Sequence, residues 1–218
     1  ENYYRDPYFP GLVDVLDKLG TKYVYVPKFA LDENWLSFFK MLRVLKREKI
    51  PVLTEYQLLG ASDFFRLLRF VVFYPFHVVR LIRSLEDNFE DRLARFALYS
   101  FSGLSSRGYL RLLYGKKLSK LPVSKIKCVS WYENQSADKC FYKGLRKTSN
   151  KALIYGAQLF IWSSGYLNLH VDEQEMEFGI LPDKVLVNGS YFLNKKSKVN
   201  FQTGPSLRYK EVFQSEMN

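Results

Sequence analysis

The chain has 218 residues, enough for one large domain or two small ones, and 47% of them are apolar, so a sizeable core can form. It carries 33 Lys and Arg against 22 Asp and Glu, a formal net charge of +11. Thirteen of these bases and five of these acids lie between residues 62 and 127, so this third of the chain holds +8 of the charge. Concentrated positive charge implies an anionic partner: phospholipid, nucleic acid, or a charged glycan or nucleotide.

The two cysteines, Cys128 and Cys140, are too few for a disulfide framework. No Cys/His spacing in the sequence resembles a zinc site. We therefore expect no metal site and a reducing, cytoplasmic setting.

The first sixty residues alternate between helical and strand patterns. Apolar spacing predicts helices at 11–20 and 33–49, the second capped by Asp32, and β-rich runs predict strands at 21–29 and 50–56. This order with short connections is typical of a parallel sheet with crossover helices.

A basic, all-helical insertion is expected at about 62–120. Its first part, residues 63–85, is apolar on most sides, and Pro75 predicts a kink or a split into two helices. A further helical stretch is expected from about 89 to 118, with a break near Ser102.

The α/β rhythm resumes after residue 120. The pattern predicts a helix at 136–147 and strands at 125–132, 151–160, 184–189 and 198–204. The expected fold is therefore α/β: a Rossmann-like domain over residues 1–218, with five to seven mostly parallel strands, flanking helices and the basic insertion.

The helix that Ser62 or Asp63 would cap carries four arginines within about a third of its circumference: Arg66, Arg69, Arg80 and Arg83. The uncharged run between Arg69 and Arg80 is far shorter than the ~20 residues of a bilayer span. An interfacial helix with arginines on lipid phosphates fits this pattern, and so does a core helix whose arginines face solvent or pair with acids. A nucleic-acid surface is the weakest interpretation, because the region has no reading motif and its aromatic residues have core spacing.

Glu133 is the first candidate for chemistry, since it follows a predicted strand and precedes a predicted helix. In open α/β sheets ligands bind at that edge, and a carboxylate there can take a proton from an attacking hydroxyl or bind sugar hydroxyls. The alternative is a helix cap, with Asn134 or Ser136 at the N-cap.

Gln158 ends the next predicted strand, so parallel neighbours would bring it to the same edge as Glu133. An amide that satisfies a buried carbonyl is the alternative. His170, in a polar loop after that strand, is a candidate base or ligand, or simply an exposed histidine. The sequence contains no GxxxxGK[ST] loop, GxGxxG fingerprint, nucleophile elbow or HExxH motif.

Four segments carry a resemblance to a known family: WYENQSADKCFYKGLRK, IYGAQLF, LPDKVLVNGSYF and TGPSLRY. They resemble the N-terminal half of bacterial surface-carbohydrate biosynthesis proteins, which are similar to GT-B glycosyltransferases of the Kdo and sialyl type in capsule and lipopolysaccharide assembly. The resemblance covers about residues 125–210. The matching positions are Glu133, Asn134, Gly144, Arg146, Gly156, Gln158, Pro182, Asp183, Asn188 and Gly189.

The resemblance implies two Rossmann-like domains that face a cleft, with the sugar-nucleotide donor held by a C-terminal domain that we expect to lie beyond this chain. No cofactor is then expected in the chain itself, which would be inactive alone. Together with the residue patterns above, the resemblance predicts Glu133 and His170 as catalytic residues, and Asn134, Gln158 and Arg146 as substrate-binding residues. The expected partners are an anionic or lipid-linked glycan acceptor, the C-terminal domain, and an anionic membrane surface contacted by the four arginines.

The leading hypothesis is thus the acceptor-side domain of a sugar-nucleotide-dependent glycosyltransferase of bacterial surface polysaccharide biosynthesis, cytoplasmic and peripheral at the inner membrane. The alternative is a non-catalytic membrane-surface or assembly module that uses the basic apolar helix. Nucleic acid is not an expected partner.

Overall fold

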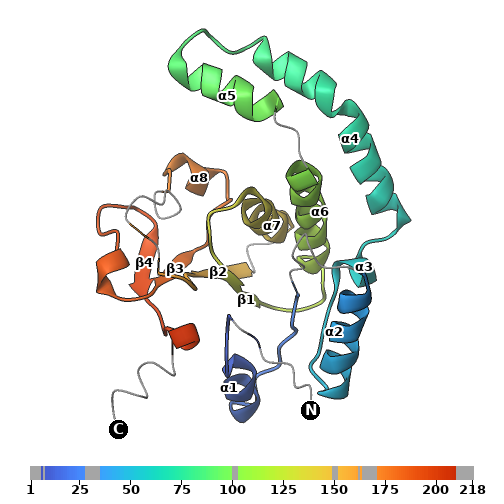
Figure 1. Cartoon of the computed structure of the whole chain (residues 1–218), viewed down its shortest axis with the longest axis vertical. Coiled ribbons are helices and arrows are strands. Elements are labelled where there is room, and N and C mark those ends of the chain that lie inside the picture. Colours follow the sequence, from blue (N-terminus) through green and yellow to red (C-terminus); the bar gives the residue numbers. More distant parts are fainter. Residues whose placement is uncertain are drawn as a thin grey trace.

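A computed structural model describes residues 6, 8–27, 35–99, 103–148, 152–161, 163 and 171–209. Four parallel strands form one sheet in the order β1-β2-β3-β4, and helices flank it (Figure 1). The elements are α1 Leu12–Lys18, α2 Trp35–Arg47, α3 Glu55–Leu58, α4 Ala61–Ile82, α5 Phe89–Tyr99, α6 Gly103–Leu118, β1 Ile126–Trp131, α7 Ser136–Arg146, β2 Ala152–Ala157, α8 Gln174–Glu177, β3 Lys184–Val187 and β4 Asn200–Thr203, with 3-10 turns at Ser190–Phe192 and Leu207–Tyr209.

The α/β class and the parallel sheet with flanking helices are confirmed, and this arrangement is consistent with a Rossmann-like fold. The expected five to seven strands are wrong for the described residues, in which the sheet has four. The two N-terminal candidates reduce to one parallel bridge between Tyr25 and Val52. Tyr25 N–H donates to Pro51 O at 2.7 Å and Leu53 N–H to Tyr25 O at 3.0 Å. Pro27 follows the first of these short runs and Pro51 precedes Val52 in the second. Proline has no N–H with which to extend a ladder.

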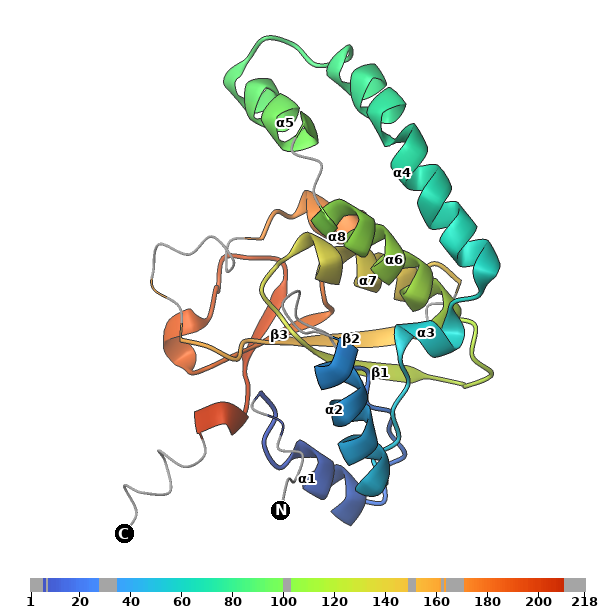
Figure 2. The ribbon, with the colours of Figure 1, turned by 45° about the vertical axis from the view of Figure 1, so that its right-hand side comes forward.

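Helices α6 and α7 pack closely on one side of the sheet, and α1 and α2 lie on the other (Figure 2). The central cluster between α6, α7 and the strands includes Tyr114, Tyr142, Ile154 and Val185, all fully buried. Burial raises the pKa of Tyr142 well above its ordinary value, and its hydroxyl lies 2.6 Å from Ser130 Oγ. The core therefore holds neutral, hydrogen-bonded tyrosine beside aliphatic side chains.

Helix α6 is tied to its neighbours by a buried ion pair. Arg111, 7% exposed, pairs with Glu55 of α3 at 2.9 Å, and its guanidinium carbon lies 4.4 Å from the ring centroid of Phe141 in α7. The part of the predicted insertion that forms α6 thus packs into the body of the domain.

Helices α4 and α5 project from this body as an arm, residues 61–99 (Figures 1 and 2). Helix α4 runs through Pro75 as one element, so of the two predicted alternatives, a kink or a split, the split is wrong. Its N-cap is Gly60 rather than Ser62 or Asp63, because Asp63 Oδ2 reaches back to accept the Gly60 N–H at 3.0 Å. The predicted break near Ser102 lies outside the described residues.

Candidate functional site

The carboxyl ends of the four strands lie along one edge of the sheet, which we call the C-terminal edge. Trp131 of β1 is opposite Ala157 of β2, and Val187 of β3 is opposite Thr203 of β4. Because all pairs are parallel, the segments that follow these residues emerge side by side. Open α/β sheets bind their ligands in this position.

The turn from β1 into α7 carries Glu133. Its Oε2 accepts a hydrogen bond from Gln135 Nε2 at 2.6 Å, and the next residue, Asn134, has a left-handed backbone with φ 56°. The N-cap of α7 is Gln135, and no side chain caps it. The alternative that Asn134 or Ser136 is the N-cap is therefore wrong, and Glu133 stays partly exposed at the strand end.

Gln158 and Asn188 join the ends of β2 and β3. The Gln158 side chain is 2% exposed, and its Oε1 accepts the Asn188 N–H at 3.0 Å. Asn188 Oδ1 in turn accepts a hydrogen bond from Ser206 Oγ, after β4, at 3.2 Å. These three residues form what we call the amide cluster. It spans three strand ends, which no local sequence pattern could show.

Both side-chain amide nitrogens of the amide cluster, Gln158 Nε2 and Asn188 Nδ2, are buried without a hydrogen-bond partner among the described residues. An amide NH2 has two donors, and a buried donor left unsatisfied costs about 1–3 kcal/mol. Buried polar groups in native proteins nearly always have partners. The donors of the amide cluster therefore suit a ligand with oxygen acceptors.

An aromatic and arginine cluster lies beside the amide cluster. Tyr8 stacks on Trp131 with ring centroids 4.6 Å apart, and Trp131 lies 5.3 Å from Phe160. The guanidinium carbon of Arg208 is 3.9 Å from the Phe160 centroid and 5.5 Å from that of Tyr8. Arg208 Nη1 is buried and has no partner among the described residues. Stacking holds the planar cation in place while its donors remain suited to a carboxylate or phosphate.

Together these groups combine hydrogen-bond donors, a carboxylate, aromatic faces and a cation. Amide donors and a carboxylate can bind hydroxyls, aromatic side chains can contact the apolar parts of a ring, and a guanidinium can pair with an acidic substituent. Within the described ranges, no three His, Cys, Asp or Glu side chains gather as metal ligands.

Arg146 lies at the C-terminus of α7, near the opposite edge of the sheet, where it holds protein groups together. Its Nη1 donates to Gly179 O at 3.0 Å and also to Leu181 O, and its Nη2 pairs with Asp183 Oδ1 at 2.9 Å. Asp183 Oδ2 accepts the Ile154 N–H at 2.6 Å. This network fixes the start of β3, so we give Arg146 a structural place and leave it out of the candidate site.

The other predicted site residues are not at the C-terminal edge, or cannot be placed. His170 lies outside the described residues. The arginines predicted to bind membranes are all exposed: Arg66, Arg69 and Arg80 lie on α4, and Arg83 is its C-cap residue.

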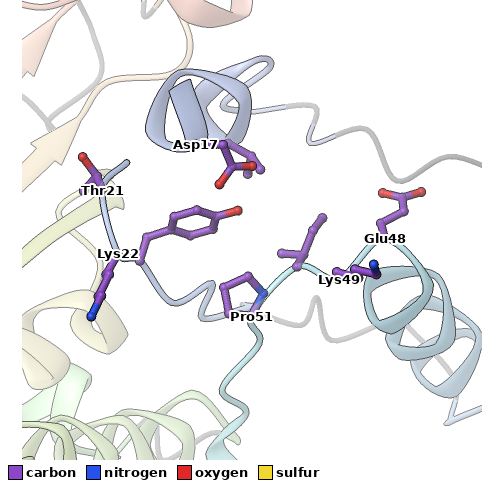
Figure 3. Close-up of a pocket in the computed structure, with 9 residues that line it drawn as sticks. Asp17, Thr21, Lys22, Glu48, Lys49 and Pro51 are labelled. Carbon is purple, nitrogen blue, oxygen red and sulfur yellow. The ribbon is translucent and has the colours of Figure 1, made fainter. Parts of the chain in front are cut away.

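A pocket of about 420 Å³ lies elsewhere, between the end of α1, residues 21–23 and residues 48–51 (Figure 3). Asp17, Lys22, Glu48 and Lys49 line it, so its charges are mixed. Burial, and then the charge and hydrogen bond of Asp17, raise the pKa of Tyr23 in its wall. None of the predicted site residues lines this pocket.

The sequence reasoning gave no role to Tyr8, Phe160, Ser206 and Arg208. One signal was present: Phe160 is the last residue of a predicted strand, close to Gln158, and Ser206 follows another predicted strand, as Glu133 does. The stacking partners are far apart in the chain, so their contact needed the structure.

No protein-family model, no curated protein and no solved structure matches this chain.

Proposed function

We propose that this chain is the acceptor-side domain of a sugar-nucleotide-dependent glycosyltransferase of GT-B-like architecture in bacterial surface polysaccharide biosynthesis. The observation that carries the proposal is the amide cluster. Gln158 and Asn188 hold donors at the ends of β2 and β3, at the same edge of the sheet as Glu133 of the β1 turn. Sugar hydroxyl and carboxylate oxygens are acceptors for such donors.

In this reaction an acceptor hydroxyl attacks the anomeric carbon of the donor. The new glycosidic bond forms as the bond from the anomeric carbon to the donor's nucleotide phosphate breaks, the nucleotide leaves, and the hydroxyl proton passes to a base. Glu133 is that base in the proposal, because its carboxylate is partly exposed at the strand end. Gln135, which donates to Glu133 Oε2, holds the carboxylate in position.

The amide cluster and Arg208 bind the acceptor in the proposal. The partly buried guanidinium of Arg208, stacked on Phe160, favours an acceptor with an acidic sugar or a lipid-linked phosphate. The sugar-nucleotide donor binds a C-terminal domain outside this chain, and the assembly works at the cytoplasmic side of the inner membrane.

The test is the glycan-forming activity of the full-length protein that contains this chain, measured for wild type and Glu133→Gln. Removal of a general base should lower kcat by about 10²–10⁴-fold and leave acceptor binding nearly unchanged. Glu177→Gln, an exposed glutamate on α8, is the matched control and should keep the wild-type rate. A Glu133→Gln protein with the wild-type rate would rule out the assigned role.

A further inference from the structure

Among the residues that the structure describes, helix α4 contacts its neighbours along one side. Of its 22 residues, only Asp63 and Val78 are buried. Phe70 stacks on Tyr109 of α6 with centroids 4.4 Å apart, and Tyr74 Oη donates to Leu98 O of α5 at 3.2 Å. At ~100° per residue, these contact residues lie within about 80° of one another around the axis, so the opposite side of α4 faces away from the body and from α5.

That opposite side is apolar along the length of the helix. Five large side chains lie within about 80° of arc at ~100° per residue and form what we call the outward stripe. Their exposed fractions range from 47% to 70%, and they are Phe65, Leu68, Val72, Phe76 and Val79. An exposed apolar surface of this extent, on a helix that holds no core role there, indicates an interaction site.

The charge beside the stripe is positive. Arg69 and Arg80 flank one side of it at about 60–80° from its centre, and Arg83 extends it beyond the C-terminus of the helix. The acid of α4, Asp63, is 1% exposed and is paired with Lys117 of α6 at 2.9 Å. The outward side of α4 is therefore apolar and cationic together.

This charge pattern selects between possible partners. In an antiparallel pair of α4 helices from two copies, like flanks meet, so arginines would face arginines. A bilayer span is not available either, since none of the helices within the described ranges has the required apolar length. A surface that combines acyl chains with anionic headgroups matches both features.

We propose that the outward stripe of α4 docks on an anionic phospholipid surface, with the helix lying in the plane of the interface. A 22-residue helix presents about 33 Å of length to such a surface. The apolar side chains enter the boundary between headgroups and acyl chains, and the flanking arginines contact lipid phosphates. Acidic residues gather instead in the turn after α4, at Glu86 and Asp87, and in the first turn of α5, at Glu90 and Asp91, so this end of the arm stays outside the interface. This inference stands whether or not the proposed glycosyltransferase function is correct.

The experiment is co-sedimentation of the full chain with two kinds of vesicle, phosphatidylcholine alone and phosphatidylcholine mixed with phosphatidylglycerol. Wild type should bind the mixed vesicles at least tenfold more strongly. The double variant Phe65→Ser/Leu68→Ser should lose at least tenfold of this binding. The matched control is Phe89→Ser/Leu93→Ser, an exposed Phe and Leu pair on α5, which should bind as wild type does.

The charge contribution is tested with Arg69→Gln/Arg80→Gln/Arg83→Gln. Each arginine near an anionic surface contributes roughly fivefold to the partition coefficient. The partition coefficient of this variant should therefore fall about a hundredfold, and the variant should no longer prefer anionic vesicles. Circular dichroism checks that every variant is folded. Equal binding to both vesicle types, binding to neither, or unchanged binding by the stripe variant would overturn the proposal. So would lipid-free self-association that the stripe variant abolishes, because a second copy would then be the partner.

Discussion

The substitution Gly144→Ala should force α6 and α7 apart, because the two helices touch through their backbones. A Cβ on Gly144 would lie 2.3 Å from Leu112 O, 3.0 Å from Lys116 N and 3.1 Å from Gly115 Cα. A Cβ on Gly115 would lie 2.5 Å from Phe141 O. These are main-chain atoms, which cannot move aside as a flexible side chain can.

Two opposing contributions set the change that Gly144→Ala causes in the free energy of unfolding. Alanine in place of glycine stabilises a helix interior by about 0.5–1 kcal/mol. Overpacking a core costs about 1–3 kcal/mol, and contact with backbone on both sides places this case at the upper end. We expect a net loss of about 2 kcal/mol in the free energy of unfolding, which lowers Tm by roughly 4–8 °C for a chain of this size.

Urea unfolding followed by circular dichroism measures this loss as a lower midpoint at unchanged slope. Gly108→Ala is the control within α6, because its Cβ would meet only Cys140 Sγ, at 3.4 Å. That variant should match wild type or gain up to about 1 kcal/mol. If Gly144→Ala were as stable as Gly108→Ala, the close helix crossing would be refuted.

Three further predictions concern buried groups. Burial opposes ionisation of Asp63, but hydrogen bonds from Lys117 and the Gly60 N–H, with the nearby positive charges, hold its pKa below the ordinary value. The Asp63 carboxylate therefore stabilises the folded state above its ordinary pKa, and this stabilisation is lost as the pH falls through its lowered pKa in the folded protein. Asp63→Asn should flatten this acid dependence of Tm, and an unchanged profile would contradict the assignment. Gly156→Ala should cost about 1–3 kcal/mol, since its Cβ would lie 2.9 Å from Tyr132 Cβ; urea midpoints equal to wild type would contradict this. Burial raises the pKa of Cys128 to about 11. In a Cys140→Ser variant, the Cys128 thiol of the folded protein should therefore react with iodoacetamide at pH 8 at least tenfold more slowly than in urea. Equal rates in the two conditions would show an accessible thiolate.

The sheet could be predicted from sequence because each strand carries a local signal. Residues 126–131, 152–157, 184–187 and 200–203 are β-rich runs bounded by turns, and α7 has an apolar face. The two N-terminal runs, residues 21–29 and 50–56, are also β-rich, yet among the described residues they pair only at Tyr25 and Val52. The length of a ladder depends on neighbouring strands, and the local sequence pattern does not show which strands will be neighbours.

The candidate site was predicted only in part. The strand-end rule found Glu133 and Gln158, but it could not show that the Gln158 amide turns to Asn188, since that contact depends on the register of β2 and β3. Similarly, Tyr8 and Arg208 lie at opposite ends of the chain and meet only in the fold.

Side-chain amide NMR tests whether the amide cluster binds an acidic glycan. The full chain, labelled with 15N, is titrated with a Kdo-terminated oligosaccharide. The NH2 resonances of Gln158 and Asn188 should shift and saturate together, and Arg208→Met should weaken binding at least tenfold. If both NH2 signals stay fixed at saturating oligosaccharide, the C-terminal edge is not the glycan site and the proposed binding is contradicted.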